Sequence, residues 1–244
     1  MKVLAIVQAR TGSSRLPNKV MKIVEGRPII EILFLRLTKA KNINQIILAT
    51  SDLKRDDNLA HHIKNIGFKV FRGSEENVLE RFFHASEKYK ADIIIRITGD
   101  CPLIDASIID EMILSFKASN LDYLSNIDPP TFPDGLDVEI FTKSSFNKVF
   151  KLSKSSFDKE HVTPFYRSSK IFKTDCFKHY KNLSDMRFTL DEALDFIFVK
   201  NVFKHFKPDI FFSWKKVVTV MNSKTSIIKS NQDIPRNEGS KKNE

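Results

Sequence analysis

Apolar residues follow two different spacings in the first half of the chain. Short aliphatic runs of the kind found in strands covered on both faces alternate with longer segments whose apolar residues recur at helical spacing. This order predicts a Rossmann-like α/β fold, with a mostly parallel central sheet, flanking helices and a ligand site at the carboxyl ends of the strands. The expected strands lie at 3–7, 46–50, 68–72 and 91–100, and the expected helices at 28–40, 54–66, 76–89 and roughly 105–118.

The second half of the chain is less regular and richer in β-type patterns. Two short helical patterns occur within 143–170, and a longer one covers 192–206. From about residue 223 the sequence is rich in Ser, Asn and Lys without periodicity, which predicts one domain over 1–222 and a disordered tail over 223–244. Further strands are expected at 122–126, 137–141, 170–177 and 186–190.

A polar loop follows the first strand directly and carries three cations. Arg10, Arg15 and Lys19 flank Gly12 and Ser13, which supply backbone freedom and a hydroxyl. Such a loop at the end of a central strand suits a polyanion such as a nucleoside triphosphate. A solvated surface turn is the alternative interpretation, since neither GxxxxGK[ST] nor GxGxxG is present.

A carboxylate ends the fourth expected strand. Asp100 follows Gly99 and precedes Pro102 by two residues, at the same edge of the sheet as the cationic loop, where it could hold a magnesium ion that bridges nucleotide phosphates. A turn aspartate that bonds its own backbone is the simpler interpretation. We reject Cys101 as a nucleophile, because no Cys/His/Asn signature accompanies it.

Composition limits the class of protein and its compartment. The 244 residues carry a formal net charge of +10, which would steer a nucleotide or an acidic sugar but would also suit a nucleic-acid-binding protein. No basic run is interleaved with aromatics, which argues against that second class. No apolar run is long enough to span a bilayer and no signal peptide is expected. Cys101 and Cys176 form no disulfide framework, which indicates a reducing cytoplasm.

Seven blocks, in order along the chain, resemble the sugar-activating cytidylyltransferases, the enzymes that make CMP-linked sugars. The branch with the best likeness is the spore coat polysaccharide biosynthesis type, with acylneuraminate and 3-deoxy-manno-octulosonate cytidylyltransferases as wider relatives. The blocks are QARTGSSRLPNKV (8–20), LATSDLKRDD (48–57), VFRGSEENVLERF (70–82), RITGDCPLID (96–105), FPDGLDVEIF (132–141), KEHVTPF (159–165) and FTLDEALDF (188–196).

The resemblance implies a nucleotide-diphospho-sugar transferase fold of the GT-A type. It also implies a small projecting arm at roughly 125–170 that closes over the sugar and helps to form a homodimer. In the family, Mg²⁺ is held by two aspartates, which correspond here to Asp100 and Asp191. The sequence departs from the family after Asp191, where Ala193 and Leu194 replace a proline and a glutamate, so the departure affects the entry to the helix more than the metal ligand.

The same likeness implies contacts to each substrate. Nucleotide-binding residues would be Ala9, Arg10, Gly12, Ser13, Arg15, Lys19, Arg72 and Thr98, with Arg72 and Thr98 reading the base. Sugar-binding residues would be Asp137, Glu139, Glu160 and His161, whose side chains can bond hydroxyl or carboxylate groups. For the acidic residues around Gly135, a solvated Pro-Gly turn is an equally good interpretation.

The expected reaction is transfer of CMP from CTP to a sugar hydroxyl, with release of pyrophosphate. Arg10, Lys19 and Asp100 would be catalytic, because charge neutralisation and positioning dominate phosphoryl-type transfers. The sugar would be a nonulosonic or ulosonic acid or a related precursor of a cell-surface polysaccharide. The alternatives are an enzyme of the same fold that uses another nucleoside triphosphate or a non-sugar acceptor, and a basic nucleic-acid-binding protein. We expect a cytoplasmic protein with no nucleic acid partner and no membrane insertion.

Overall fold

A seven-stranded mixed sheet forms the centre of the molecule in the computed structural model, which describes residues 1–223 together with Asn231, Ile234 and Arg236. The strand order is β5-β4-β1-β6-β8-β7-β9, and β8 is antiparallel to both of its neighbours. The strands are β1 (Val3–Gln8), β4 (Gln45–Ser51), β5 (Lys69–Gly73), β6 (Ile93–Thr98), β7 (Tyr123–Ser125), β8 (Glu139–Thr142) and β9 (Thr174–Cys176), and a separate hairpin joins β2 (Ile23–Val24) to β3 (Arg27–Pro28).

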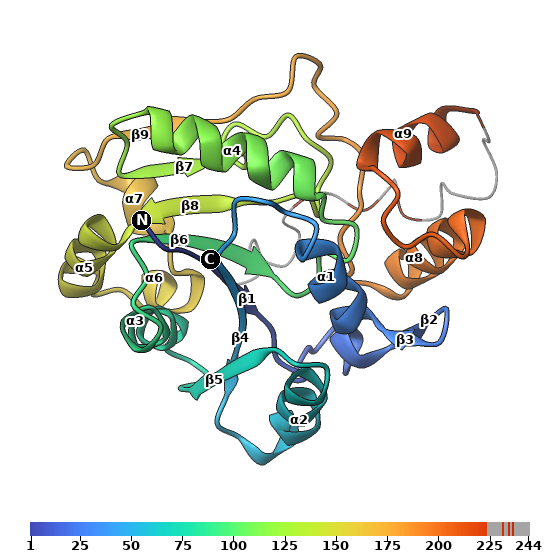
Figure 1. The fold of residues 1–244 in the computed structure, drawn as a ribbon, viewed down its shortest axis with the longest axis horizontal. Coiled ribbons are helices and arrows are strands. Elements are labelled where there is room, and N and C mark those ends of the chain that lie inside the picture. The colour runs from blue at the N-terminus through green and yellow to red at the C-terminus, as the bar shows by residue number, and fades with distance from the viewer. Residues whose placement is uncertain (224–230, 232–233, 235, 237–244) are drawn as a thin grey trace.

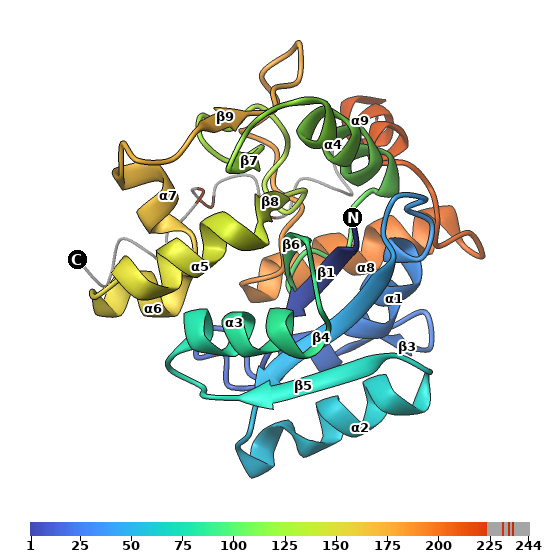
Figure 2. The same ribbon diagram turned by 60° about the vertical axis from the view of Figure 1, so that its left-hand side comes forward.

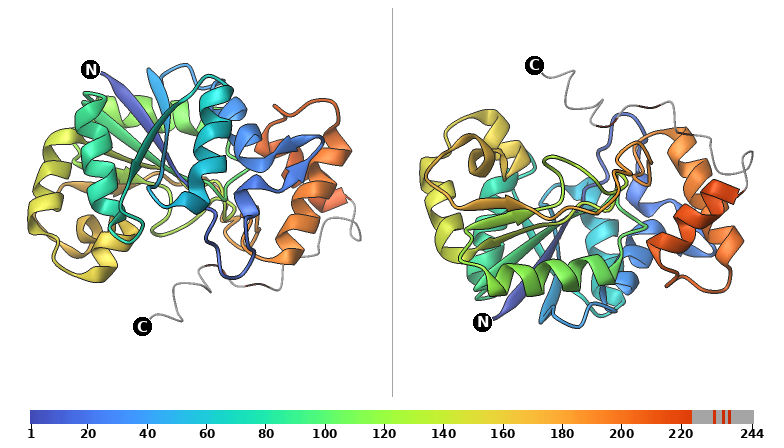
Figure 3. Two further views of the ribbon diagram at one scale, coloured as in Figure 1. Left: turned by 90° about the horizontal axis from the view of Figure 1, so that it is seen from below. Right: turned by 90° about the horizontal axis from the view of Figure 1, so that it is seen from above.

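Helices cover both faces of this sheet (Figure 1 and Figure 2). They are α1 (Ile29–Leu37), α2 (Asp57–Asn65), α3 (Val78–Lys88), α4 (Ala106–Ala118), α5 (Lys143–Leu152), α6 (Ser156–His161), α7 (Pro164–Ser168), α8 (Ala193–Phe206) and α9 (Trp214–Ser223), with 3₁₀ turns η1 (Lys19–Met21) and η2 (Lys54–Asp56). Figure 3 shows α5 to α7 at one end of the molecule and α8 with α9 at the other.

The side chains of β1 explain why helices cover both faces of the sheet. Val3 and Val7 pack into the core that contains α1, α4 and α8, whereas Leu4 and Ile6 pack into a second core with α3 and α5. Successive residues of a strand point to opposite faces, so a strand buried on both sides must be apolar throughout. The sequence pattern therefore places β1 correctly at the centre of the sheet.

The carboxyl ends of β1 and β6 meet closely. Gln8 lies opposite Thr98 in the parallel register, and the Gly99 N–H donates to the Gln8 carbonyl at 2.8 Å. A Cβ on Gly99 would lie 2.6 Å from the Cβ of Ala9, so only glycine allows this approach. The loop after β1 and the turn that holds Asp100 are thus brought side by side.

The second half differs from the sequence expectation in three places. Residues 186–190 are not a strand; Arg187 makes only an isolated bridge with Asp134. Helix α9 was not expected, although its buried residues Trp214, Val217 and Met221 recur at helical spacing. The strand expected at 170–177 is shorter in the structure, where it covers only 174–176.

The segment expected to project as an arm, roughly 125–170, is instead largely part of the body. β8 lies between β6 and β7, and α5 buries Phe146 and Val149 fully in the second core. The physical reason is that both elements carry large apolar side chains, which an exposed arm would leave in water. Most of the tail predicted for 223–244 lies outside the described residues.

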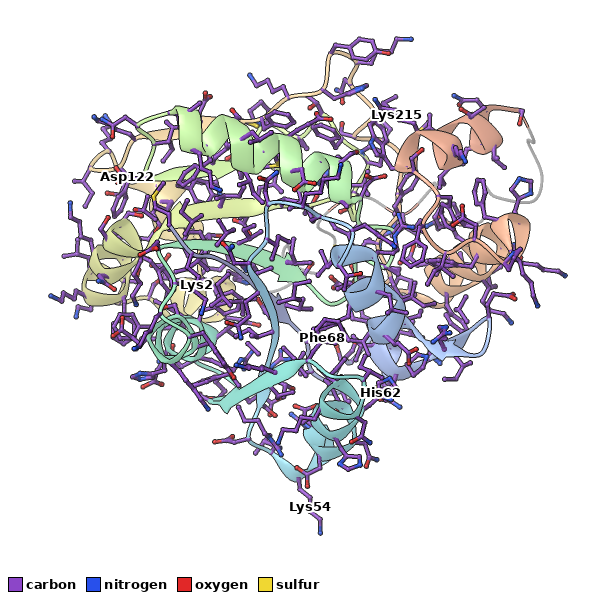
Figure 4. All side chains as sticks on the ribbon, in the orientation of Figure 1. Lys2, Lys54, His62, Phe68, Asp122 and Lys215 are labelled. Atoms are coloured by element: carbon purple, nitrogen blue, oxygen red, sulfur yellow. The ribbon has the colours of Figure 1, made fainter. Side chains whose placement is uncertain are left out.

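Charged side chains are spread around the outside of the molecule. Lys54 and Lys215 point outward at widely separated places, and Asp122 lies at a third (Figure 4). Among the residues that the structure describes, no helix combines the length and the apolar character that crossing a membrane requires.

Candidate active site at the ends of β1 and β6

The loop after β1 is fixed by a buried carboxylate. The Thr11 N–H and the Thr11 hydroxyl both donate to Asp56 Oδ1 at 2.7 Å, and the Ser51 hydroxyl donates to Asp56 Oδ2. Burial would raise the pKa of Asp56, but these hydrogen bonds from Ser51 and Thr11 lower it below its ordinary value. Asp56 was not among the expected site residues, although it lies in one of the recognised blocks. Its role is to hold the loop, which it fixes to η2.

Lys19 lies between the two carboxylates expected to bind metal. Its Nζ donates to Asp100 Oδ2 at 2.8 Å and to Asp191 Oδ1 at 2.7 Å, and only 12% of its side chain is exposed. Burial opposes ionisation of Asp100, yet the ammonium lowers the pKa of Asp100 to about 2. The pKa of Lys19 is raised in turn, because the attraction of Asp100 and Asp191 outweighs its burial. Lys19 and Asp100 are therefore both charged at neutral pH.

Asp191 is positioned by the first turn of α8. The Asp195 carboxylate accepts the N–H groups of Asp191 and Glu192 at 2.9 and 2.8 Å, and it receives Nε and Nη2 of Arg187, each at 2.9 Å. Arg187 also donates to Asp134 at 3.1 Å. A buried bidentate pair of this kind has a defined geometry, so it fixes where Asp191 points. Sequence reasoning missed Arg187 and Asp195 in this role.

A cavity of about 370 Å³ opens in front of these groups. It brings together most of the expected nucleotide and metal residues with two of the expected sugar residues, and it adds several that were not expected. The expected lining residues are Ala9, Arg10, Gly12, Ser13, Arg15, Lys19, Thr98, Asp100, Glu160, His161 and Asp191; the added ones are Gln8, Ser14, Val20, Arg81, Gly99 and Asp134.

Cations surround this first cavity on several sides. Arg15 lies 3.3 Å from Asp191 and bonds Glu192 at 3.1 Å, and Arg10 lies 3.4 Å from Glu75. Arg81 is buried, donates to the Ser74 carbonyl at 2.5 Å, and has an Nε without a hydrogen-bond partner among the described residues. Burial lowers the pKa of Arg81 to about 10, so it stays charged at neutral pH. The cavity is therefore suited to an anion.

A second cavity of about 510 Å³ adjoins the first, and His161 lines both. Asp137, Thr163, Arg96, Arg167 and Arg236 also line it. Burial raises the pKa of Asp137 to about 7, although Arg236 acts to lower it. Burial lowers the pKa of His161, which favours its neutral form.

Two expected contact residues line neither of these cavities. Glu139 is buried beneath the second one, where it accepts the Tyr123 and Thr163 hydroxyls at 2.6 and 2.5 Å and pairs with Arg96. Arg72, on the edge strand β5, donates to the carbonyls of Ser51 and Leu53 at 2.9 and 2.8 Å. Both side chains are engaged in holding neighbouring parts of the protein, so the structure does not bring them to the substrate cavities.

Cys101 lies beside Asp100 but is poorly suited to act as a nucleophile. Burial raises the pKa of its thiol well above the ordinary value, and the nearby Asp100 carboxylate adds to this. Its Sγ lies 3.1 Å from the Thr98 hydroxyl. The reactive form of cysteine is the thiolate, so these surroundings keep the side chain unreactive.

The carboxylates could hold a divalent cation only with help from a substrate. Among the described residues, no group of three or more His, Cys, Asp or Glu side chains is arranged to bind a metal alone. Asp100 and Asp191 nevertheless both reach a single nitrogen. Mg²⁺ binds through one or two carboxylates plus phosphate oxygens and water, so this donor set fits it.

Comparisons with known proteins agree with this geometry. The cytidylyltransferase family profile matches residues 4–231. An uncharacterized protein of Methanocaldococcus jannaschii is 40% identical over 84% of this chain and 85% of its own length. The spore coat polysaccharide biosynthesis protein SpsF of Bacillus subtilis is 31% identical over 90% and 94%. A 3-deoxy-manno-octulosonate cytidylyltransferase of Hydrogenovibrio crunogenus is 32% identical, over half of each chain.

Solved structures show the same fold. A cytidylyltransferase from Leptospira borgpetersenii superimposes with a TM-score of 0.91 at 33% identity, covering 97% of this chain and 100% of its own. CMP:2-keto-3-deoxy-manno-octonic acid synthetase, solved with CTP, gives 0.66 at 16% identity over 84% and 99%. A Mycobacterium tuberculosis protein solved with manganese gives 0.53 at 12% identity over 80% and 96%. The chain belongs to the cytidylyltransferase family of nucleotidyltransferase enzymes.

Proposed function

We propose that the protein transfers CMP from CTP to a hydroxyl group of an acidic sugar and releases pyrophosphate. The observation that carries this proposal is the placement of Lys19 between Asp100 and Asp191 in an anion-binding cavity at the ends of β1 and β6. A cation-rich loop and two converging carboxylates serve a nucleoside triphosphate with its metal ion better than they serve a neutral ligand.

The loop side chains neutralise the triphosphate. Lys19 and Arg10 meet the phosphate oxygens, Arg15 assists from the rim, and the buried Arg81 supplies a further positive charge. Groups held in place before the reaction stabilise the developing charge without rearranging, which is the main source of rate in such transfers. Asp56 contributes indirectly, since it keeps the loop in position through Thr11.

Asp100 and Asp191 would hold the divalent cation, which we take to be Mg²⁺. When bound, the ion polarises the α-phosphate and makes the attacking hydroxyl more acidic. The chain's own contribution is geometric: Asp195 and Arg187 fix Asp191, and the tight turn at Gly99 fixes Asp100. We propose that Lys19 leaves the two carboxylates and contacts the phosphates when CTP enters.

The second cavity would bind the acceptor. Asp137 and His161, which line this cavity, would bond its hydroxyls together with Glu160 from the first cavity, and Glu139 would orient Arg96 and Arg167 from below. The names of the relatives point to sugar acids such as 3-deoxy-manno-octulosonate and to the biosynthesis of spore coat polysaccharide. Another nucleoside triphosphate or a non-sugar acceptor remains the alternative within the same fold.

Pyrophosphate release tests the proposal directly. The purified protein is assayed with each of four ribonucleoside triphosphates and with 3-deoxy-manno-octulosonate, acylneuraminates and sugar phosphates, with and without EDTA. We expect release only with CTP, an acidic sugar and a divalent cation. Asp100→Asn should lower turnover by roughly 10² or more, because a charged metal ligand is lost. Asp52→Asn, at the exposed end of β4, is the matched control.

Equal rates with several nucleoside triphosphates would overturn the choice of CTP, and full activity in excess EDTA would overturn the metal site. We further propose a cytoplasmic location, because CTP is made there and because both cysteines are free. The homodimer also remains a proposal, which light scattering of the purified protein would test.

A further inference from the structure

His161 lies where the two cavities adjoin. Among the described residues it is the one that lines both of them. On one side of it, Glu160 Oε1 lies 4.0 Å from Nη2 of Arg10, which belongs to the loop after β1. On the other side, the Thr163 hydroxyl donates at 2.5 Å to Glu139, beneath the second cavity. His161 therefore stands where an acceptor hydroxyl would have to meet the α-phosphate of a nucleotide.

The backbone at the end of α6 fixes the direction of this side chain. Val162 is fully buried and has a φ of 72° and a ψ of −47°. The Thr163 N–H donates to the His161 carbonyl at 2.8 Å, which closes a γ-turn. A β-branched residue rarely adopts a positive φ, and strained backbone of this kind persists only where the surrounding structure imposes it. The ring of Phe157, centred 4.5 Å from the imidazole, packs against it. These contacts hold the imidazole at the junction of the cavities.

The imidazole of His161 is free to take up a proton. Neither ring nitrogen has a hydrogen-bond partner within the part of the chain that the structure describes. Burial lowers its pKa below the ordinary 6.5, and the guanidinium groups of Arg96 and Arg167 add to this, while the carboxylates of Glu160 and Glu139 act against it. A neutral imidazole carries one nitrogen with a lone pair, so it can serve as a base at neutral pH.

The other ionisable groups at the cavities are less suited to this task. The Asp137 carboxylate also has a pKa near neutrality, but it lines the second cavity alone and is paired with Arg236 at 2.6 Å. Arg81 of α3 lines the first cavity, and its guanidinium stays charged and has no lone pair to offer. The position at the junction therefore singles out His161.

We infer that His161 is a catalytic residue that accepts the proton of the attacking acceptor hydroxyl. This inference rests on the proposed function, because it takes the two cavities to be the nucleotide and acceptor sites. In this step the acceptor O–H bond breaks and its proton moves to a ring nitrogen, while the oxygen bonds to the α-phosphorus. The bond between the α-phosphorus and its bridging oxygen breaks, and pyrophosphate leaves with that electron pair. The imidazolium then returns the proton to water.

Single-turnover kinetics separate proton transfer from binding. The protein is held in excess over labelled CTP, with a saturating concentration of the sugar that supports the fastest pyrophosphate release in the panel above. His161→Gln should lower the rate constant by roughly 10² or more, because an amide keeps hydrogen-bonding groups but cannot take the proton. The KM for the sugar and the affinity for CTP should change by less than about threefold. His84→Gln, on the exposed face of α3, is the control and should react at the wild-type rate.

The pH profile and chemical rescue show whether basicity is what matters. The wild-type rate constant should fall on the acid side of the His161 pKa, because the imidazolium has no lone pair. His161→Gln should lack this part of the profile, whereas any effect of Asp137 is common to both proteins. Imidazole added to His161→Ala should restore part of the rate in proportion to its unprotonated form. The inference is overturned if His161→Gln reacts within about threefold of the wild-type rate, or if its pH profile parallels that of the wild type.

The proposed transferase activity is judged separately. A wild type that releases no pyrophosphate with CTP and any sugar of the panel would remove the CMP transfer, whereas an active wild type and an equally active His161→Gln would remove only the role of His161. The NMR signal of this imidazole, identified among the six histidines by its loss in His161→Gln, should titrate below the ordinary 6.5. An imidazole that is still charged at about pH 8 would overturn the inference whatever the protein's activity.

Discussion

At the scale of single residues, the position of Lys19 says most about how the site could work. Its ammonium occupies the point where Asp100 and Asp191 converge, which is the point that a divalent cation would take. A positive charge there repels a second one, so the free enzyme should bind metal weakly. The triphosphate of CTP offers Lys19 other partners, and binding of nucleotide and metal should therefore reinforce each other.

Replacing Lys19 by methionine should have opposite effects on metal binding and turnover. Without nucleotide, the two carboxylates lose their cation, and their affinity for Mn²⁺, measured by electron paramagnetic resonance, should rise by about tenfold or more. Turnover should fall by roughly 10² or more, because charge on the phosphates is no longer met. Lys22→Met, three residues along, should change neither quantity. Unchanged or weaker Mn²⁺ binding in Lys19→Met would contradict this view of the site.

Asp137 should give acceptor binding a dependence on pH. Burial raises its pKa from the ordinary 3.8 to about 7, so the carboxylate is ionised above that pH and protonated below it. Only the ionised form accepts hydrogen bonds with both oxygens from sugar hydroxyls and Arg236. The KM for the acceptor should therefore rise as the pH falls from about 8 to about 6. Burial lowers the pKa of His161, which favours its neutral form.

The Asp137→Asn variant tests whether the Asp137 carboxylate causes this pH dependence. Asp137→Asn should have a higher KM that is nearly constant over the same pH interval, while its affinity for CTP stays close to that of the wild type. A parallel pH profile in wild type and variant would assign the titration to another group. A large loss of CTP affinity would place Asp137 in the nucleotide half of the site.

At the scale of elements, the start of α8 links the interior of the protein to the proposed metal site. Asp195 completes the capping box of the helix with Glu192, holds Arg187 in a buried bidentate pair and accepts the N–H of Asp191, so one side chain serves stability and also the position of the proposed metal ligand. The turn at the end of β6 positions Asp100 in a different way. Gly99 has no Cβ, so the turn can approach Ala9 closely.

Asp195→Asn should lower both the stability of the protein and its affinity for metal. Breaking a buried ion pair costs about 3 to 5 kcal/mol in the free energy of unfolding, since Arg187 loses a charged partner. Mn²⁺ affinity in the presence of CTP should fall as well, because Asp191 is no longer held. Asn77→Ala removes the cap of α3 and should cost only about 1 kcal/mol without affecting the metal. Wild-type Mn²⁺ binding in a destabilised Asp195→Asn protein would limit Asp195 to a structural role.

Gly99→Ala tests whether the close approach of Gly99 to Ala9 positions Asp100. The added methyl group would lie 2.6 Å from the Ala9 Cβ, so the ends of β1 and β6 must separate. We expect a loss of about 1 to 3 kcal/mol in the free energy of unfolding, as is usual when a packed site is overfilled. CTP affinity should fall with it, because Ala9 and Thr98 line the cavity. Gly67→Ala is a useful contrast, since a Cβ there meets nothing within 4 Å and only its positive φ is strained.

The elements also show what the sequence could and could not predict. The β1 loop and the Gly99–Asp100 turn were predictable, because a strand pattern followed by polar residues marks a strand end, and parallel strand ends share one edge. That Asp100 and Asp191 lie together was expected only through the family resemblance, and the contact of Lys19 with both of them was not expected. Arg187, Asp195 and Arg236 were not expected in the site, because long-range ion pairs leave no periodic signal in one sequence.

At the scale of the whole molecule, the net charge of +10 needs an explanation beyond the active site. Some of the positive charge lines the two cavities, where we propose that it binds anions. Much of the rest is dispersed, as the outward positions of Lys54 and Lys215 at distant points of the surface illustrate (Figure 4). Dispersed charge raises the rate of encounter with an anionic substrate but offers no continuous track for a nucleic acid.

This distribution leads to a final prediction about nucleic acids. A labelled single-stranded RNA should bind, at physiological salt, no more tightly than the non-specific range of about 10⁻⁴ to 10⁻⁶ M, because too few cations lie together to release many counterions. Fluorescence anisotropy measures this, and the CTP affinity of the same preparation shows that the protein is intact. Changing Lys54 and Lys215 to glutamine should weaken any RNA binding slightly and leave the kinetics with CTP unchanged. A nanomolar affinity with a steep dependence on salt would instead require a basic surface with a function of its own.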